Sequence, residues 1–145
     1  MAKGIILVLG GTDAATPTVL NSILHSIGKA LEGLPTAICA VFMYIFQTIF
    51  DFFVTSGSGQ AALTMPIMAP LSDVVGVTRQ VSTLAYQLGA GFADAIVPTS
   101  ASLMGVLGVA KIEWGKYAKW QIKMQGFFFV IGCIFMIVAV AMGFN

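Results

Sequence analysis

The chain has 145 residues, of which 58% are hydrophobic and 9% are charged, and its formal net charge is +1. Soluble domains carry about 25% charged residues, so this composition excludes an ordinary soluble domain and also a disordered chain. The small net charge leaves no basic surface for nucleic acid, and both cysteines lie in long apolar runs, which indicates neither a disulfide framework nor a metal pair. The class that remains is an all-α integral membrane protein.

The first predicted element is an amphipathic helix over residues 16–33. Thr16 offers a hydroxyl N-cap, a proline follows at the first helical position, and Gly33 ends the helix. Next to membrane segments such a helix lies in the interface plane. His25 on its polar face has no second ligand at metal spacing and indicates a solvated side chain. The apolar run 5–9 is too short to span and resembles the last turns of a helix whose beginning is missing.

Residues 36–75 predict a re-entrant helical hairpin. An apolar arm over 36–54 leads to a polar, glycine-rich tip at 55–60, and a second arm with two prolines follows. Such a tip is tolerated at membrane depth only where protein or a water-filled cavity surrounds it. Gln47 and Asp51 in the first arm are four residues apart and share a face. We expect Asp51 to lie near an interface or in a structural pair, or else to turn toward protein or water.

Residues 78–111 predict a broken transmembrane helix. Pro98 removes a backbone donor, hydroxyl groups follow it directly, and we expect the second half to restart at Thr99 or Ser100. The alternative is a proline kink that these hydroxyl groups satisfy, which is common in membrane helices. Polar side chains, Asp94 among them, line one face of the first half at steps of three and four residues.

Residues 111–123 predict an amphipathic loop at the cytoplasmic face of the membrane. The segment holds four of the seven basic residues and both tryptophans, which is typical of a positive loop beside an interfacial aromatic belt. Residues 124–144 are uncharged and apolar from Gly126 onward and predict a transmembrane helix. With this loop in the cytoplasm, the hairpin enters from the outer side and Asn145 is external.

The stretch 56–71 resembles the hairpin of the anaerobic four-carbon-dicarboxylate carrier family, and within it the branch of basic amino-acid antiporters. The stretches 74–80, 91–100 and 103–108 are similar to the same family. Its members are much longer, so the chain resembles their C-terminal part. The family belongs to a wider ion-transporter superfamily, and the resemblance implies one inverted repeat of an elevator-type carrier. It also implies a multi-pass protein of the bacterial cytoplasmic (inner) membrane.

Two helix starts define the candidate site, one at the hairpin tip and one after the break. Each start offers free N–H groups and a partial positive charge of about half a unit, so two of them near the midplane suit a carboxylate. Unwound carbonyls and the hydroxyl groups of Ser56, Ser58 and Thr99 suit a sodium ion, and a proton is the other candidate coupling ion. We expect the tip glycines to take positive φ. Asp94 would face the basic side chain of an amino acid. The candidate substrate-binding or ion-binding residues are Ser56, Gly57, Ser58, Gly59, Gln60, Asp94, Pro98, Thr99 and Ser100.

Three functions remain open. The first is the C-terminal part of a secondary active transporter for dicarboxylates or amino acids, by ion-coupled transport or exchange. The second is a truncated fragment that does not transport and that associates with a missing N-terminal half or as a homo-oligomer. The third is a small structural membrane protein, which would need no polar residues at two helix breaks. No nucleophile–base pair or metal cluster stands out, so we expect no enzyme and no cofactor, and the lipid bilayer and a small carboxylate as partners.

Overall fold

The computed structural model describes Lys29 and residues 33–144, and the described part contains helices and loops without strands. The helices are α3 (Thr36–Asp51), α4 (Gly57–Val74), α5 (Arg79–Ala93), α6 (Ala101–Ala110) and α7 (Trp114–Ala141). Most of the predicted interfacial helix, His25 and the run 5–9 lie outside the described residues. An all-helical architecture is therefore present throughout the described part.

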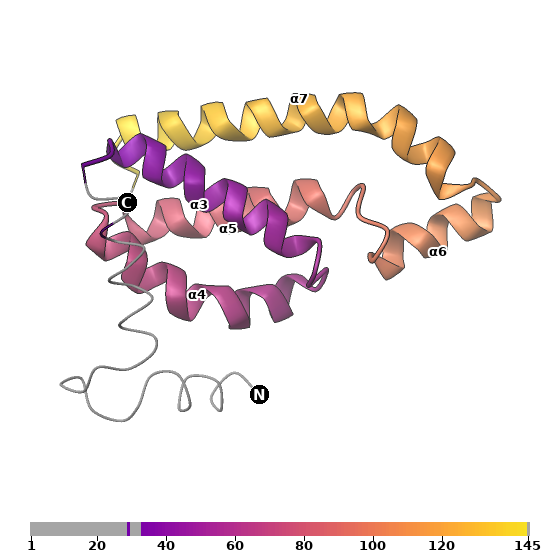
Figure 1. Cartoon of the computed structure of the whole chain (residues 1–145), viewed down its shortest axis with the longest axis horizontal. Helices are drawn as coiled ribbons and strands as arrows, with labels where there is room; N and C mark the ends of the chain where they lie inside the picture. Colours follow the sequence, from indigo (N-terminus) through magenta and orange to yellow (C-terminus); the bar gives the residue numbers. More distant parts are fainter. Residues whose placement is uncertain (1–28, 30–32, 145) are drawn as a thin grey trace.

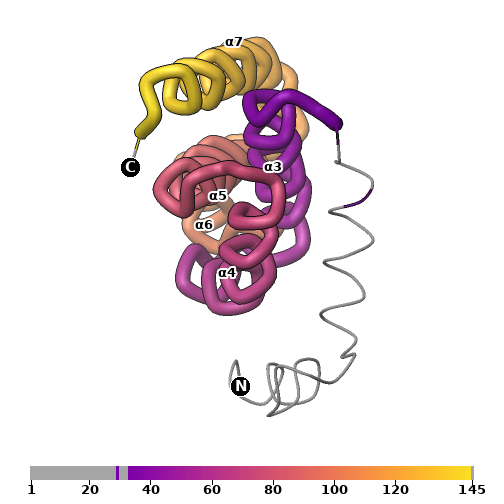
Figure 2. The backbone as a smooth tube through the Cα atoms, turned by 90° about the vertical axis from the view of Figure 1, so that its left-hand side faces the viewer, coloured from indigo at the N-terminus to yellow at the C-terminus, as the bar shows by residue number. Residues whose placement is uncertain are grey.

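The chain runs back and forth, so that α3 and α5 point one way and α4 and α7 point the other (Figure 1). Figure 2 shows α5 between α4 and α7, with α3 alongside. α5 packs against all three of these helices, and α3 also packs against α7. α6 continues beyond the end of α5, toward the beginning of α7. This arrangement brings the end of α3, the end of α5 and the beginning of α7 to one end of the bundle.

The core forms where small residues let the helices approach closely. A Cβ atom at Gly89 of α5 would lie 2.8 Å from the Cβ atom of Gln47 on α3. A Cβ atom at Gly132 of α7 would collide with the hydroxyl group of Tyr44, a fully buried residue of α3. Tyr44 also stacks on Phe129, with ring centroids 5.4 Å apart. Packing through small residues is the usual way in which membrane helices gain contact area.

α3 and α4 form an antiparallel pair joined by residues 52–56. The connection lies earlier than the sequence predicts, because residues 57–60 are the first turn of α4 and not part of the tip. Pro66 and Pro70 lie inside α4 and do not end it. A proline costs a helix one backbone hydrogen bond, and in membrane proteins the neighbouring groups can compensate for that loss.

The break between α5 and α6 covers residues 94–100. It begins four residues before Pro98, and α6 starts at Ala101, one or two residues later than predicted. The residue before a proline disfavours helical backbone angles, which keeps Val97 out of a helix. Ser100 has the extended backbone of an N-cap, so α6 cannot begin before Ala101.

The prediction of a loop over 111–123 is wrong for most of its length. Lys111 takes a left-handed φ of 55° at the end of α6, two residues follow, and α7 begins at Trp114. The segment from Trp114 to Lys123 has no proline, and three lysines, one glutamine and one alanine in it are good helix formers. α7 therefore includes the polar stretch that precedes its apolar part.

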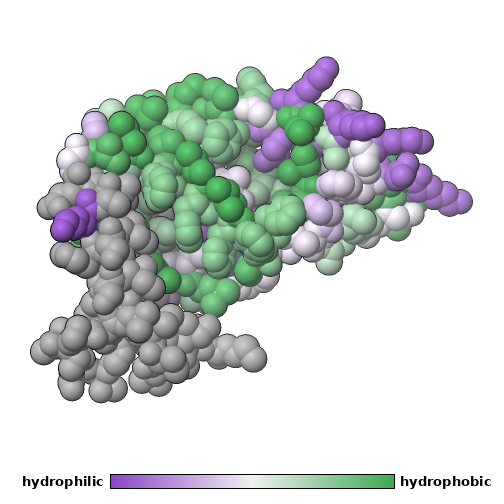
Figure 3. Space-filling view, viewed as in Figure 1, coloured by the Kyte–Doolittle hydropathy of each residue, from purple (hydrophilic) through white to green (hydrophobic). Residues whose placement is uncertain are grey.

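Among the described helices, α7 alone is long and apolar enough to cross a membrane. α3 and α6 are apolar but shorter. Large apolar side chains are exposed along α3 and α7, and Figure 3 shows the hydrophobic surface that they form. Exposed apolar area of this extent marks a surface that contacts lipid or another protein.

Candidate functional site

Two hydrogen bonds join the α3–α4 connection to the α5–α6 break. The hydroxyl group of Thr55 donates to the carbonyl oxygen of Thr99 at 3.2 Å. The hydroxyl group of Thr99 donates to the carbonyl oxygen of Phe52 at 3.1 Å. Two interruptions that are far apart in the sequence are thus held side by side.

A helix begins at each of these interruptions, and each beginning is capped by a serine. Ser56 accepts a hydrogen bond from the N–H of Gly59 at 3.3 Å, and Ser100 accepts one from the N–H of Leu103 at 3.4 Å. These are ordinary N-caps, which satisfy one of the free donors of a helix start. Within the described residues, the N–H groups of the two helix residues that follow each cap have no hydrogen-bond partner. Four N–H donors therefore remain without a partner in the described part.

The predicted sodium ligands differ in what they already bind. Ser58 and Thr99 are exposed, and the hydroxyl group of Ser58 makes no hydrogen bond within the described residues. Ser56 acts as a cap, and Thr99 joins the two interruptions. Each hydroxyl oxygen keeps a lone pair, so these residues retain the chemistry that a sodium ion requires. Pro98 lies half-buried in the break beside them.

Gln60 lies away from the surface, in a buried hydrogen-bond network, although its own side-chain oxygen has no partner among the described residues. Its side-chain amide donates to the carbonyl oxygen and to the side-chain oxygen of Gln47, each at 2.9 Å. Gln47 donates to the hydroxyl group of Thr64 at 3.1 Å, and Thr64 donates to the carbonyl oxygen of Gln60 at 2.9 Å. All three residues are buried. The network clamps α3 to α4 and gives Gln60 a positioning role beneath the helix start.

The expectation of positive φ at Gly57 and Gly59 is wrong, because both belong to the first turn of α4. Gly59 has a different reason to be small: a Cβ atom there would lie 3.1 Å from the capping oxygen of Ser56. The carbonyl oxygen of Gly57 accepts a hydrogen bond of 2.6 Å from Tyr86 of α5. Sequence reasoning missed Tyr86, since no local pattern links a tyrosine to a glycine 29 positions earlier.

Asp51 and Asp94 lie at the neighbouring ends of α3 and α5. These helices are parallel and cross closely where Gly89 meets Gln47, so the residues four or five positions further on come to the same level. Asp51 is 2% exposed, and each aspartate has one buried oxygen without a hydrogen-bond partner among the described residues. We expect Asp51 near an interface, in a structural pair, or turned toward protein or water. The structure shows Asp51 buried against protein, and it forms no ion pair within the described part.

A cavity of about 370 Å³ lies next to this end of the bundle. Phe52 and Phe53 of the α3–α4 connection, Val97 of the break and Gln125 of α7 contribute to its lining, which is apolar apart from Gln125 and one threonine. An apolar lining of this kind does not suit a carboxylate. The cavity therefore adjoins the polar site and is distinct from it.

The beginning of α7 holds the break from the other side. The indole N–H of Trp114 donates to the carbonyl oxygen of Ile96 at 3.1 Å, and the hydroxyl group of Tyr117 donates to that of Ala95 at 2.9 Å. The sequence assigned these aromatic residues to a membrane belt and gave no sign of this second contact. The break is thus fixed by α7 as well as by the hairpin.

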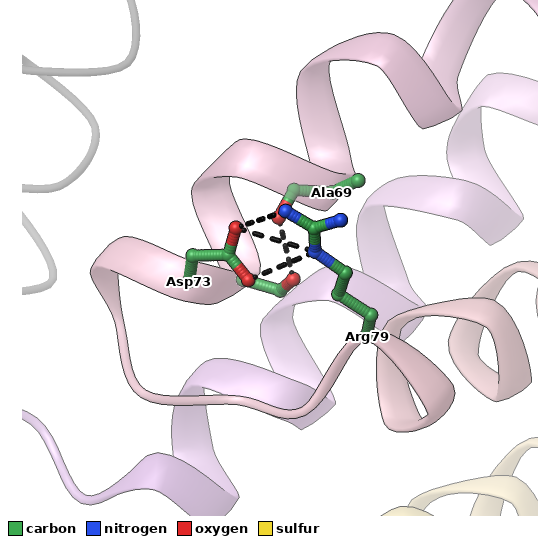
Figure 4. Close-up of polar contacts among 4 residues, drawn as sticks. Ala69, Asp73 and Arg79 are labelled. Carbon is green, nitrogen blue, oxygen red and sulfur yellow. Dashed lines mark hydrogen bonds and ion pairs between the residues drawn. The ribbon is translucent and has the colours of Figure 1, made fainter. Parts of the chain in front are cut away.

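The ion pair of Asp73 and Arg79 lies at the opposite end of α4, in the turn that leads to α5 (Figure 4). The closest contact joins Arg79 Nη2 to Asp73 Oδ2 at 2.7 Å, and Nε donates to Oδ1 at 3.1 Å. The hydrogen bond from Arg79 lowers the pKa of the Asp73 carboxyl from its usual value of 3.8. Both side chains are exposed, so the pair closes a surface turn and takes no part in the site.

A helical hairpin and a broken helix that meet at their polar interruptions are features that secondary carriers share. The chain belongs to the C4-dicarboxylate anaerobic carrier family (DcuC), which matches residues 1–141. This match confirms the resemblance inferred from the hairpin sequence. It also confirms that the protein belongs with carriers and not with enzymes.

Two curated relatives match nearly the whole chain. The "Putative basic amino acid antiporter YfcC" of Escherichia coli (strain K12) is 51% identical over 144 residues, which cover 99% of this chain and 28% of the relative. An uncharacterized protein of Haemophilus influenzae is 30% identical over 142 residues, which cover 98% of this chain and 27% of the relative. The chain thus spans little more than a quarter of either relative's length. No solved structure matches the chain.

Proposed function

We propose that the chain supplies one substrate-binding repeat of a secondary active transporter for carboxylate-bearing metabolites in the bacterial cytoplasmic (inner) membrane. The observation that carries this proposal is a pair of hydrogen bonds between the α3–α4 connection and the α5–α6 break: Thr55 donates to the carbonyl oxygen of Thr99, and Thr99 donates to that of Phe52. In this reading α3 and α4 are the re-entrant hairpin, and α5 and α6 are the broken helix, of an elevator-type carrier with several membrane passages.

The chemistry of the two helix starts supports an anionic ligand group. Each start carries a partial charge of about +0.5, and four N–H groups beside the caps have no partner within the described residues. A carboxylate that accepts hydrogen bonds from such donors gains about 1.5–3 kcal/mol per bond. No buried arginine is needed for this recognition.

The two aspartates favour an amino acid over a dicarboxylate. Asp51 and Asp94 place unpaired carboxylate oxygens near the same end of the bundle, where they would repel the second carboxylate of a dicarboxylate. A basic amino acid offers a carboxylate to the helix starts and a cation to the aspartates. The name of the Escherichia coli relative agrees with this choice.

Coupling is proposed at the same place. The hydroxyl oxygens of Ser56, Ser58 and Thr99 would accept a sodium ion, and Asp51 and Asp94 would accept a proton in its stead. Exchange of one substrate for another needs neither ion. Transport by the whole carrier separates the three modes. Sodium coupling predicts a dependence on sodium, proton coupling predicts a dependence on pH, and exchange predicts neither.

The second candidate is a fragment that does not transport by itself, and the short coverage of the relatives favours it. In this case the two helix starts lack an opposing wall, which a second polypeptide or a second copy would supply. Uptake of labelled arginine by proteoliposomes that contain only this chain tests the point, and measurable uptake contradicts it.

Binding by the purified chain tests the proposal directly. We expect arginine to raise the melting temperature of the chain in detergent, while agmatine, which lacks the carboxylate, and succinate, which lacks the cation, raise it less. Thr99→Val should abolish the arginine effect. Thr83→Ala is the matched control, because Thr83 is exposed on α5 and its hydroxyl group contacts only its own helix. An equal response to all three compounds would overturn the proposed ligand class.

A further inference from the structure

The first three turns of α7 carry a row of exposed positive charges. Lys116, Lys119 and Lys123 follow one another at steps of three and four residues, which places them on one face of the helix. Trp120 lies within this row and is 68% exposed. We call these four residues the lysine stripe.

The lysine stripe faces away from the rest of the protein. The other face of the same turns is fixed by Trp114 and Tyr117, which donate hydrogen bonds to the carbonyl groups of the α5–α6 break. Gln121 continues this inner face and is 7% exposed. The rotation of α7 about its axis is therefore determined, and the lysines have no protein surface in front of them within the described part.

The length of α7 sets the depth of the lysine stripe. A helix of 28 residues is about 42 Å long at 1.5 Å per residue, close to the roughly 40–45 Å of a bilayer with its headgroups. The helix is uncharged after Lys123 and apolar from Gly126 onward. This apolar part occupies the hydrocarbon, so the stripe stands at the level of the headgroups. An exposed tryptophan at this level is typical of the interfacial aromatic belt.

The charges of the lysine stripe are not neutralised by the described residues. The one ion pair among the described residues joins Asp73 to Arg79 in the α4–α5 turn, at the other end of α4. Glu113 is exposed at the start of α7 and makes no ion pair with a described lysine. Figure 3 shows hydrophilic side chains gathered at the end of the molecule where α6 meets α7, next to the apolar surface.

We propose that the lysine stripe binds the phosphate headgroups of anionic phospholipids in the leaflet that holds the beginning of α7. Lysine side chains reach along the helix to the headgroups and attract anionic lipid, and three of them on one face act together. The same helical turns hold the carbonyl groups of Ala95 and Ile96. Headgroup binding therefore fixes the depth of the α5–α6 break relative to the membrane surface.

Native mass spectrometry of the full chain in neutral detergent tests the proposal. We expect phosphatidylglycerol to remain bound in preference to phosphatidylcholine. Replacing all three lysines (Lys116→Gln, Lys119→Gln and Lys123→Gln) should weaken phosphatidylglycerol binding by roughly 100-fold, from about fivefold per lysine. The matched variant with three arginines at these positions should bind it like the parent chain. Helicity by circular dichroism should be the same in all three proteins, since the exchanged residues are exposed and are all good helix formers.

Three results would overturn the proposal. The first is equal retention of the two lipids by the parent chain. The second is a glutamine variant that keeps the preference for phosphatidylglycerol. The third is complete displacement of phosphatidylglycerol by inorganic phosphate at equal concentration, which would assign the stripe to a soluble phosphate compound.

Discussion

Thr55 and Thr99 each stand one residue before an N-cap serine, and each donates its hydroxyl hydrogen to the backbone of the opposite interruption. The starts of α4 and α6 are therefore related by a reciprocal contact, which fixes their distance before any ligand binds. In the proposed function, a preorganised arrangement of this kind would lower the entropic cost of binding a carboxylate between them.

Replacing Ser58 separates ligand binding from helix capping. Ser58→Ala removes an exposed hydroxyl group that makes no hydrogen bond within the described residues, so the melting temperature of the free chain should stay unchanged. If the hydroxyl group contacts the ligand, the affinity for arginine should fall by about 1–3 kcal/mol, or about 5-fold to 150-fold. Titration calorimetry measures this loss. An unchanged affinity would remove Ser58 from the site.

Replacing Ser56 should give the opposite balance. Ser56→Ala removes the cap of α4 and leaves the N–H of Gly59 without its acceptor, which should lower stability by about 1 kcal/mol. Ser56→Asp restores a capping oxygen and should recover this loss. Melting temperatures of the two variants check the prediction, and equal losses in both would show that the cap contributes nothing.

The buried amide network should be sensitive to a single change. Gln60→Leu leaves the side-chain oxygen of Gln47 without its donor, and burial of an unsatisfied polar group costs about 1–3 kcal/mol. Gln87→Leu is the matched control, because Gln87 is exposed on α5. The melting temperature should fall for the first variant and stay close to that of the parent for the second. Similar values for both would mean that the network adds no stability.

The contact between α7 and α3 predicts a contrast between two glycines of one helix. Gly132→Ala places a methyl group against the ring of Tyr44 and should cost about 1–3 kcal/mol by overpacking. Gly126→Ala meets nothing within 4 Å and should leave stability unchanged or raise it by up to about 1 kcal/mol. Denaturation of both variants in detergent gives the comparison. A neutral Gly132→Ala would show that α7 can move away from α3 without loss.

The ion pair of the α4–α5 turn predicts a pH dependence. Because the folded pKa of Asp73 is lowered, the stability from this pair is fully present above the unfolded value of about 3.8 and is lost as the pH falls through the folded value. Asp73→Asn should flatten the fall of the melting temperature in acid, and high salt should do the same. Glu113→Gln is the control, as Glu113 is an exposed carboxylate without an ion pair in the described residues. An acid profile that Asp73→Asn leaves unaltered would contradict the assignment.

Local sequence patterns predicted the elements of this fold but not the contacts between them. The glycine-rich stretch after Asp51 and the proline at 98 marked both interruptions, because turn residues and lost backbone donors act within a few positions. The prediction of a loop over 114–123 is wrong, because lysine and tryptophan are typical of a membrane interface whether the backbone there is a loop or a helix. The contacts of Tyr86 and Gln60 depend on how distant helices pack, and composition carries no signal for that.

The hydrogen bonds around the two interruptions have a consequence for the sign of the charge that the site selects. The carbonyl oxygens of Phe52, Gly57, Ala95, Ile96 and Thr99 each already accept a hydrogen bond from a side chain. These five backbone acceptors are thus engaged, whereas the N–H donors of the two residues after each N-cap have no partner in the described part. Open N–H donors at a helix start give the backbone there a positive electrostatic potential. In the proposed function, the main chain at the two starts would therefore recognise an anion, and side chains would recognise a cation. A zwitterion would consequently bind in one orientation.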